Sequence, residues 1–299
     1  MRKGDEVIHP PARQGLRRME PCGMATEQLD TAAIMRGLYG DGIIALKGAF
    51  DRAWTQRLAE DIDLLFAEAR ARPRGALPRG PERYYVEVHP ERLRGFVDIV
   101  THPWFVAVCQ AMLGPDYKVV EVGFDVPGPG AQDQPWHRDF PMPDATRIGR
   151  RLNSLAFNLT AVDTVPEMGP LEIAPGTQWD DFAPPSEDRE TGMFPPRSLY
   201  PRYEARAQTR MPQMGDVSAR SALMIHRGTA NRSNRSRPVA VVGVDAPDAD
   251  NAARHDLQAT RAYFDGLPPF VREHLTCRVV DRLEDIEQAH SIRGLLQTY

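Results

Sequence analysis

Residues 136–140 read Trp-His-Arg-Asp-Phe, and a second histidine, His226, closes an apolar run far downstream. Along a β-strand, residues i and i+2 face the same side, so His137 and Asp139 would present an imidazole and a carboxylate together. His226 would add a second imidazole. Two imidazoles and one carboxylate form the facial triad that holds ferrous iron and leaves positions open for a co-substrate and oxygen. The pattern predicts a metal centre built at strand ends.

On both sides of this stretch, Gly, Pro and Asn turns divide the chain into short apolar or alternating runs that are typical of β-strands. The expected strands are residues 43–46, 84–88, 117–126, 153–162, 171–174, 216–226 and 238–245. The expected helices are residues 26–39, 52–71, 103–113, 251–264 and 284–296. Helices followed by many short strands, with ligands at two strand ends, favour a mainly β fold with flanking α-helices. We expect a double-stranded β-helix, a cupin-like jelly roll.

A single arginine just before an apolar strand supports the predicted metal centre. Arg237 precedes Pro238 and Val239, eleven positions after His226. If His226 ends one strand and Arg237 opens the next, the guanidinium can point into the same cavity as the metal. There it would form a two-point contact with a carboxylate, which a lysine cannot match. Iron together with a carboxylate clamp suggests 2-oxoglutarate as co-substrate.

Four motifs in this order resemble the phytanoyl-CoA dioxygenase family of iron(II)- and 2-oxoglutarate-dependent oxygenases. They are Gln134-Pro-Trp-His137-Arg-Asp139, Met168-Gly-Pro-Leu-Glu-Ile-Ala-Pro-Gly-Thr177, Gly215-Asp216 ahead of Ile225-His226-Arg-Gly, and Asn231-Arg-Ser-Asn-Arg-Ser-Arg237-Pro. The resemblance covers residues 123–244 and, more weakly, residues 39–50. Beyond about residue 247 nothing matches, which leaves the role of residues 247–299 open.

The resemblance implies that His137, Asp139 and His226 bind Fe(II), that Arg237 binds 2-oxoglutarate, and that O2 is the second co-substrate. The implied reaction is hydroxylation of a C–H bond in a small molecule, with release of succinate and CO2. Desaturation, cyclisation and epimerisation stay open, because they begin with the same hydrogen abstraction. Halogenation is not expected, since the family's halogenating members replace the carboxylate ligand with Gly or Ala. The chain departs from the family at Gln178, where His is usual, which predicts an altered hydrogen bond near the site.

Further polar and aromatic residues are candidates for the cavity wall. Asn158 lies within an apolar strand and is expected to bind a 2-oxoglutarate carboxylate, although a buried Asn satisfied by backbone is an equal alternative. We expect side chains at the substrate mouth from five residues: Gln134, Trp136, Phe140, Tyr84 and Tyr85. The alternative for the aromatic members is ordinary core packing.

Composition narrows the class of protein. The chain has 299 residues, 37 basic and 41 acidic side chains and a formal charge of −4, so no basic patch for nucleic acid or an anionic membrane is expected. Three widely separated cysteines favour a reducing compartment over a disulfide framework. No apolar run is long enough to span a membrane. We expect a cytoplasmic protein, monomeric or homodimeric, that acts on a small molecule.

The domain organisation expected is a flexible arm over residues 1–24 and one oxygenase domain over residues 25–299, with Met24 as a possible alternative start. Two other functional classes remain. The same ligand set could hold zinc in a hydrolase, although such a site has no use for Arg237. The chain could also be a non-catalytic relative that binds a metal or another ligand.

Overall fold

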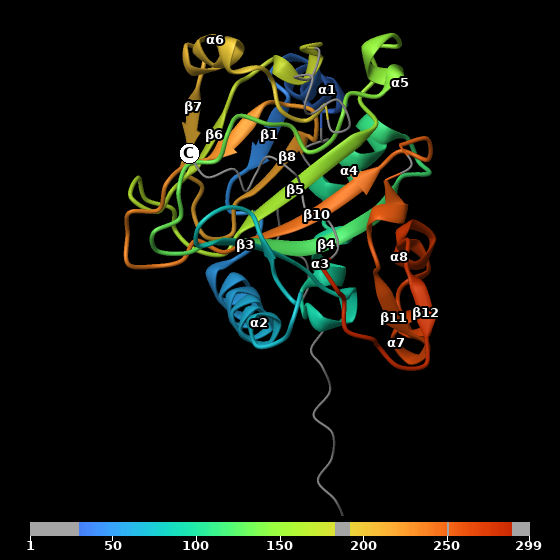
Figure 1. The fold of residues 1–299 in the computed structure, drawn as a ribbon. Coiled ribbons are helices and arrows are strands. Elements are labelled where there is room, and N and C mark those ends of the chain that lie inside the picture. The colour runs from blue at the N-terminus through green and yellow to red at the C-terminus, as the bar shows by residue number, and fades with distance from the viewer. Residues whose placement is uncertain (1–29, 183–191, 250, 289–299) are drawn as a thin grey trace, which may run out of the picture. The chain divides into compact units, whose positions relative to one another are not determined.

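The computed structural model describes residues 30–182, 192–249 and 251–288, and its largest element is a seven-stranded antiparallel sheet (Figure 1). The strands in spatial order are β1 (Ile43–Leu46), β8 (Val217–Ser221), β5 (Ser154–Thr160), β10 (Val239–Asp245), β4 (Lys118–Pro127), β3 (Arg83–Glu87) and β2 (Leu77–Pro78). Apart from the β2–β3 pair, neighbours in this sheet are far apart in the sequence. Side chains from distant segments therefore meet on its inner face.

A second antiparallel sheet of three strands completes the β core. It consists of β7 (Gln208–Arg210), β6 (Leu171–Ile173) and β9 (His226–Gly228), with β6 in the centre. Both sheets contribute side chains to one cavity. This confirms the predicted mainly β, jelly-roll fold.

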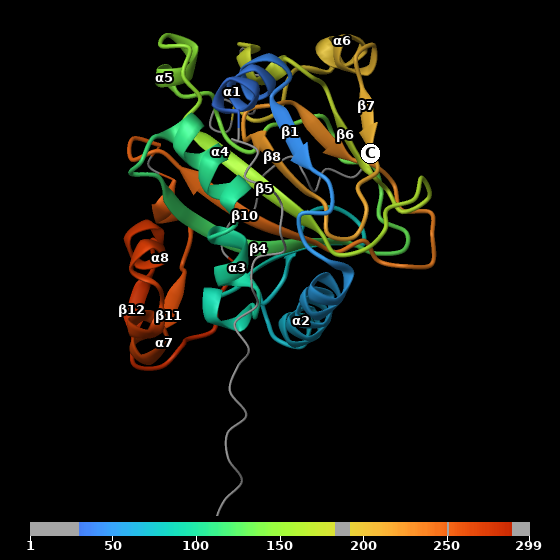
Figure 2. The same cartoon turned by 180° about the vertical axis from the view of Figure 1, so that it is seen from behind.

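Four N-terminal helices pack against the large sheet: α1 (Thr31–Gly40), α2 (Arg52–Arg70), α3 (Phe96–Val100) and α4 (Pro103–Leu113). Seen from behind, α4 lies in front of the large sheet, and α2 and α3 lie below it in the view (Figure 2). In α2, Asp51 caps the first turn by accepting a hydrogen bond from the Trp54 amide, while Leu58, Ile62 and Leu65 join the main core. The helices seal one face of the sheet with apolar side chains, which leaves the other face for polar groups.

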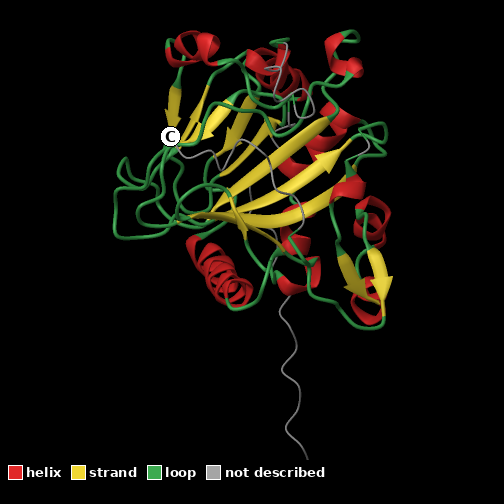
Figure 3. Ribbon diagram, viewed as in Figure 1, coloured by secondary structure: helices red, strands yellow, loops and turns green. Residues whose placement is uncertain are grey.

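The remaining elements are short (Figure 3). The α-helices are α5 (Asp144–Arg147), α6 (Tyr200–Glu204), α7 (Arg261–Gly266) and α8 (Pro269–His274). Single 3₁₀ turns span Pro90–Arg92, Thr177–Trp179, Arg197–Leu199 and Ala252–Arg254. The strands β11 (Gln258–Thr260) and β12 (Arg278–Val280) form a small parallel sheet.

Two predicted elements differ from the structure. The helix expected over residues 251–264 is wrong, because Gln258 and Ala259 are buried in β11 and Thr260 caps the start of α7 instead. The helix expected over residues 284–296 is absent from residues 284–288, and the rest lies outside the described residues, as does the predicted arm. Among the described helices none is long and apolar enough to cross a membrane.

A third difference decides where a metal ligand lies. The strand expected over residues 216–226 is two strands, because the chain turns after Ser221, whose carbonyl accepts a hydrogen bond from the Met224 amide. The first part, β8, belongs to the large sheet, and His226 opens β9 in the small sheet. The turn therefore carries His226 from one sheet to the other.

Candidate metal centre

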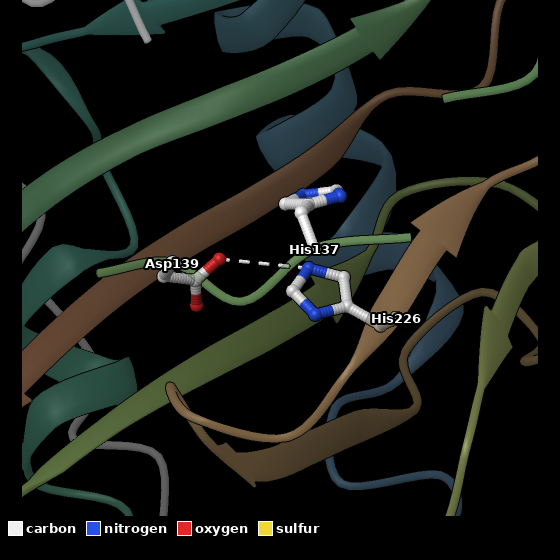
Figure 4. A group of neighbouring side chains, drawn as sticks. All are labelled: His137, Asp139 and His226. Carbon is white, nitrogen blue, oxygen red and sulfur yellow. Dashed lines mark ion pairs between the residues drawn. The ribbon is translucent and has the colours of Figure 1, made fainter. Parts of the chain in front are cut away.

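His137, Asp139 and His226 come together in the interior, as Figure 4 shows. One nitrogen or oxygen atom from each residue lies within 4.8 Å of the corresponding atoms of the others. Backbone pairing sets this arrangement, because the His137 amide donates to the His226 carbonyl over 3.0 Å and the reverse bond spans 2.9 Å. The two imidazole rings consequently lie side by side, with their centroids 4.4 Å apart.

Hydrogen bonds fix how the two imidazoles are presented. Each Nδ1 lies 2.9 Å from the carbonyl of the residue two positions earlier, Pro135 for His137 and Met224 for His226. A carbonyl only accepts, so each Nδ1 carries the proton and each Nε2 keeps its lone pair for a metal. Burial lowers the pKa of His137 to about 4 and that of His226 well below its usual value. Both rings are therefore neutral and ready to ligate near neutral pH.

Asp139 is held ionised by an arginine that the sequence analysis did not single out. Arg220 donates from Nη1 to Oδ2 over 2.6 Å and from Nη2 to Oδ1 over 3.3 Å. Burial opposes ionisation of Asp139, but the charge and hydrogen bonds of Arg220 outweigh it and place the pKa well below its usual range. Oδ1 also lies 3.5 Å from Nε2 of His226. The carboxylate thus faces the two imidazoles.

Arg237 lines the same cavity and is nearly fully buried. Its Nε donates to the Gly169 carbonyl over 3.0 Å, and no hydrogen bond among the described residues uses its two terminal nitrogens. Burial, and then repulsion from Arg83, lower the pKa of Arg237 to about 10, so the guanidinium stays charged at neutral pH. A buried cation with two free donors is a site for a carboxylate.

The cavity has a volume of about 750 Å³ and contains the triad, Arg237 and four other residues proposed from the sequence: Asn158, Gln134, Phe140 and Tyr85. Asn158 lies on the inner face of β5, opposite Ser218 of β8 and Val241 of β10. Gln134 donates toward the Arg79 carbonyl and accepts a hydrogen bond from the Gly228 amide, which ties its side chain to the cavity wall.

Two residues expected at the substrate mouth lie elsewhere. Tyr84 points to the opposite face of β3 from Tyr85, where Arg70 and Phe66 of α2 pack on its ring. Trp136 is fully buried in a separate apolar cluster with Tyr203 and Ile225. Trp136 therefore serves core packing, which was the alternative considered for it, and Tyr84 packs half-buried against α2.

Gln178 forms no part of the metal centre. Its side chain is fully buried, and its Nε2 lies 2.9 to 3.2 Å from the carbonyls of Leu38, Tyr39 and Gly40 at the end of α1. The departure from the family pattern at this position alters a helix terminus rather than a hydrogen bond to a ligand of the metal centre.

Sequence reasoning missed most charged residues of the cavity, among them Arg220, Arg79, Glu121 and Asp245. Arg220 and Asp245 do sit in predicted strands at positions whose alternation puts them on one face. Which partner each would meet depends on the pairing of β8, β5, β10 and β4, and no local pattern states that pairing.

The residues present fit a divalent metal of the iron type and a dicarboxylate. Two neutral imidazoles and one carboxylate form the donor set, and all three residues line the cavity. Arg237 supplies a charged anchor in the same space. This arrangement can bind a metal with open positions together with an anionic chelator.

Comparison with known proteins gives a family match over most of the chain. The model of the family described as phytanoyl-CoA dioxygenase (PhyH) matches residues 38–239, which include all three triad residues and Arg237. No curated protein matches the chain in a direct comparison.

Several solved structures share the fold at low sequence identity. EctD from S. alaskensis, crystallised with 2-oxoglutarate and 5-hydroxyectoine, is 16% identical with a TM-score of 0.58 over 79% of this chain and 86% of that chain. The epimerase SnoN from nogalamycin biosynthesis is 18% identical with a TM-score of 0.54, covering 73% of this chain and 82% of its own. The carbocyclase SnoK from the same pathway is 17% identical with a TM-score of 0.56, over 75% of this chain and 90% of that chain.

Proposed function

Because the chain belongs to the phytanoyl-CoA dioxygenase family, we propose that it is an Fe(II)- and 2-oxoglutarate-dependent dioxygenase. The reaction proposed is hydroxylation of an unactivated C–H bond in a small-molecule substrate, with release of succinate and CO2. The observation that carries the proposal is the presence in one cavity of an intact triad, whose two imidazoles are buried, and of a buried guanidinium with free terminal nitrogens.

Each residue has a distinct part in this proposal. His137, Asp139 and His226 hold the metal, and Arg237 binds the far carboxylate of 2-oxoglutarate. Asn158, on the inner face of β5, is placed to hydrogen-bond the co-substrate. Bound iron supplies oxygen activation coupled to decarboxylation of 2-oxoglutarate. The chain itself positions both reactants and excludes water from the cavity.

The same scaffold supports a second candidate reaction. SnoN is described as an epimerase and SnoK as a carbocyclase, and both share the fold of this chain. The mass of the product separates the alternatives once a substrate is found. Hydroxylation adds one oxygen atom, ring closure or desaturation removes two hydrogen atoms, and epimerisation leaves the mass unchanged.

The first test is an anaerobic titration of metal-free protein with Fe(II) and 2-oxoglutarate, following the visible charge-transfer band of the chelate. We expect a band in the wild type, none in His137→Ala, and a much higher 2-oxoglutarate requirement in Arg237→Ala. Arg235→Ala is the matched control, because Arg235 lies two positions away and is exposed.

Failure of the band to form in folded wild-type protein would overturn the proposal. Tight Zn(II) binding without a response to 2-oxoglutarate would then favour a hydrolase. Weak binding of every metal would favour a non-catalytic relative.

A further inference from the structure

Charged side chains of opposite sign lie in the cavity without an ion-pair partner. Arg79 lines the cavity beside β2, and no ion pair joins it to any described carboxylate. Glu121 on β4 and Asp245 on β10 also line the cavity, and within the described ranges neither pairs with an Arg or Lys. Asp245 is buried, whereas Arg79 and Glu121 are half-buried. Removing a charge from water without a partner is costly, so such groups mark a place where a ligand can supply the opposite charge.

Tyr85 links the two sets of charges. Its hydroxyl donates to Oε1 of Glu121 over 2.5 Å, while the Arg79 guanidinium lies over its ring, 4.7 Å from the ring centroid. The Tyr85 hydroxyl donates its single proton to Glu121. Toward the cavity, the phenol oxygen and Oε2 of Glu121 can therefore only accept hydrogen bonds. This part of the wall therefore requires a ligand that donates hydrogen bonds.

Two glycines make room for this pair of side chains. A Cβ at Gly123 would come within 2.6 Å of the Tyr85 hydroxyl, and one at Gly243 would come within 2.6 Å of Oε2 of Glu121. Gly243 stands between Glu121 and Ala156 in the sheet register, and Ala156 pairs with Arg220 of the metal centre. The small residues Gly243 and Ala156 therefore lie between Glu121 and Arg220, and no large side chain fills the inner face of the sheet there.

Asp245 extends the acceptor surface and is 4% exposed. Its buried Oδ2 has no partner within hydrogen-bonding distance. Burial raises the pKa of Asp245, while the nearby side chains of Ser154 and Asn251 lower it and the negative charge of Glu121 raises it further. Asp245 stands two positions along β10 from Gly243, the register partner of Glu121, so both carboxylates line the same stretch of the cavity wall.

Arg79 also carries an unmet donor, because its Nε is buried and has no hydrogen-bond partner. It lines the same cavity as His137 of the triad. Two charged neighbours are already paired, Glu87 with His255 and Arg83 with Asp125. Arg237 is assigned to 2-oxoglutarate in the proposed function. Beside Tyr85, the charges that have no ion pair among the described residues are Arg79 and Glu121, and Asp245 lies further along β10.

We propose that the cavity binds a zwitterionic, amino-acid-type substrate, whose carboxylate contacts Arg79 and whose ammonium group contacts Glu121 and Asp245. This assignment rests on the proposed oxygenase function and names the class of substrate that the site accepts. A substrate held at both ends would be fixed across the space that opens toward the metal. Two-point binding of this kind orients a molecule more strictly than apolar contact does.

The test uses three matched series of ligands with four to eight carbon atoms: ω-amino acids, the corresponding alkylamines and the corresponding fatty acids. Each is titrated calorimetrically into the full-length protein loaded with Co(II) and saturating 2-oxoglutarate, and also into the metal-free protein. We expect one ω-amino acid to bind at least tenfold tighter than its matched amine and fatty acid.

Glu121→Gln keeps the size of the side chain, Arg79→Gln shortens it, and each removes one charge. We expect Glu121→Gln to abolish the advantage over the fatty acid, and Arg79→Gln to abolish the advantage over the amine. Glu68→Gln on α2 is the control, because Glu68 is exposed and pairs with Arg92 outside the cavity. Circular dichroism of each variant verifies folding.

No binding of any ω-amino acid at millimolar concentration would overturn the proposal, as would tightest binding of a fatty acid or an unchanged preference in both variants. The charge-transfer band is a separate readout in the same preparations. A normal band without amino-acid binding rejects only the substrate class, whereas amino-acid binding to metal-free protein without a band rejects only the oxygenase function.

Discussion

Arg220 and Asp139 form a two-point contact inside the cavity, with Nη1 bound to Oδ2 at 2.6 Å and Nη2 near Oδ1 at 3.3 Å. The shorter bond engages Oδ2 and leaves Oδ1 as the oxygen that faces Nε2 of His226. Arg220 thereby favours ligation through a single carboxylate oxygen. One oxygen and two imidazoles leave three positions of an octahedral metal open, as a chelating co-substrate and oxygen require.

We predict that Arg220→Gln weakens metal binding by about ten- to a hundredfold, which is the range for residues that orient metal ligands. The variant removes the charge that keeps Asp139 ionised and frees Oδ2 to compete for the metal. Calorimetric titration with Co(II) measures the dissociation constant, and the visible Co(II) spectrum reports any change in coordination number.

Arg94→Gln is the matched control, since Arg94 also pairs with a carboxylate, Asp61, but away from the cavity. Its Co(II) affinity should equal that of the wild type. An unchanged affinity and spectrum in Arg220→Gln would show that Asp139 needs no partner to ligate.

Metal binding should also be insensitive to moderate acid. The pKa of His137 is lowered to about 4 and that of His226 lies well below its usual value, so both rings stay neutral as the pH falls from 7.5 to 5.5. The lowered pKa of Asp139 keeps the carboxylate ionised over the same interval. We predict that the Co(II) dissociation constant changes by less than about threefold, because protons compete with a metal only near the pKa of the ligand.

Titrations at pH 7.5, 6.5 and 5.5 in one buffer mixture check this prediction. Two imidazoles with the ordinary pKa of about 6.5 would each be about nine-tenths protonated at pH 5.5, which weakens binding by about a hundredfold. A loss of that size would mean that the rings are more accessible to water than their burial indicates.

The triad and Arg237 could be found in the sequence because each has a local signature. His137 and Asp139 follow the two-residue period of a strand, and Arg237 stands directly before an apolar strand. Arg220 and Glu121 carry no such signature. Their roles arise from the order β8-β5-β10-β4, in which every neighbour is distant in sequence.

The break inside residues 216–226 shows a second limit of sequence reasoning. The run is apolar enough to be read as one strand, and the turn at residues 222–225 is buried rather than marked by Gly or Pro. Only the sheet pairing reveals that His226 belongs to β9 and bonds to His137. The ligand was therefore identified correctly, while the strand that carries it was not.

Gln178 departs from the family pattern, and its contacts indicate that it affects the stability of the fold and not the metal centre. We predict that Gln178→Ala lowers the free energy of unfolding by about 1–3 kcal/mol, because it leaves buried carbonyls at the end of α1 without a donor. A Cβ at Gly42 would lie only 2.6 Å from Oε1 of Gln178, so the surrounding chain is closely fitted to this side chain. Urea denaturation followed by circular dichroism measures the change.

Gln213→Ala is the control for that experiment, because Gln213 is exposed and its side chain bonds only to the nearby Met211 carbonyl over 3.3 Å. Its stability should change by less than about 0.5 kcal/mol. The Co(II) dissociation constant of Gln178→Ala should match that of the wild type, since the nitrogen of Gln178 is committed to α1. A large loss of metal affinity with little loss of stability would instead place Gln178 in the support of the metal centre, as the family resemblance first suggested.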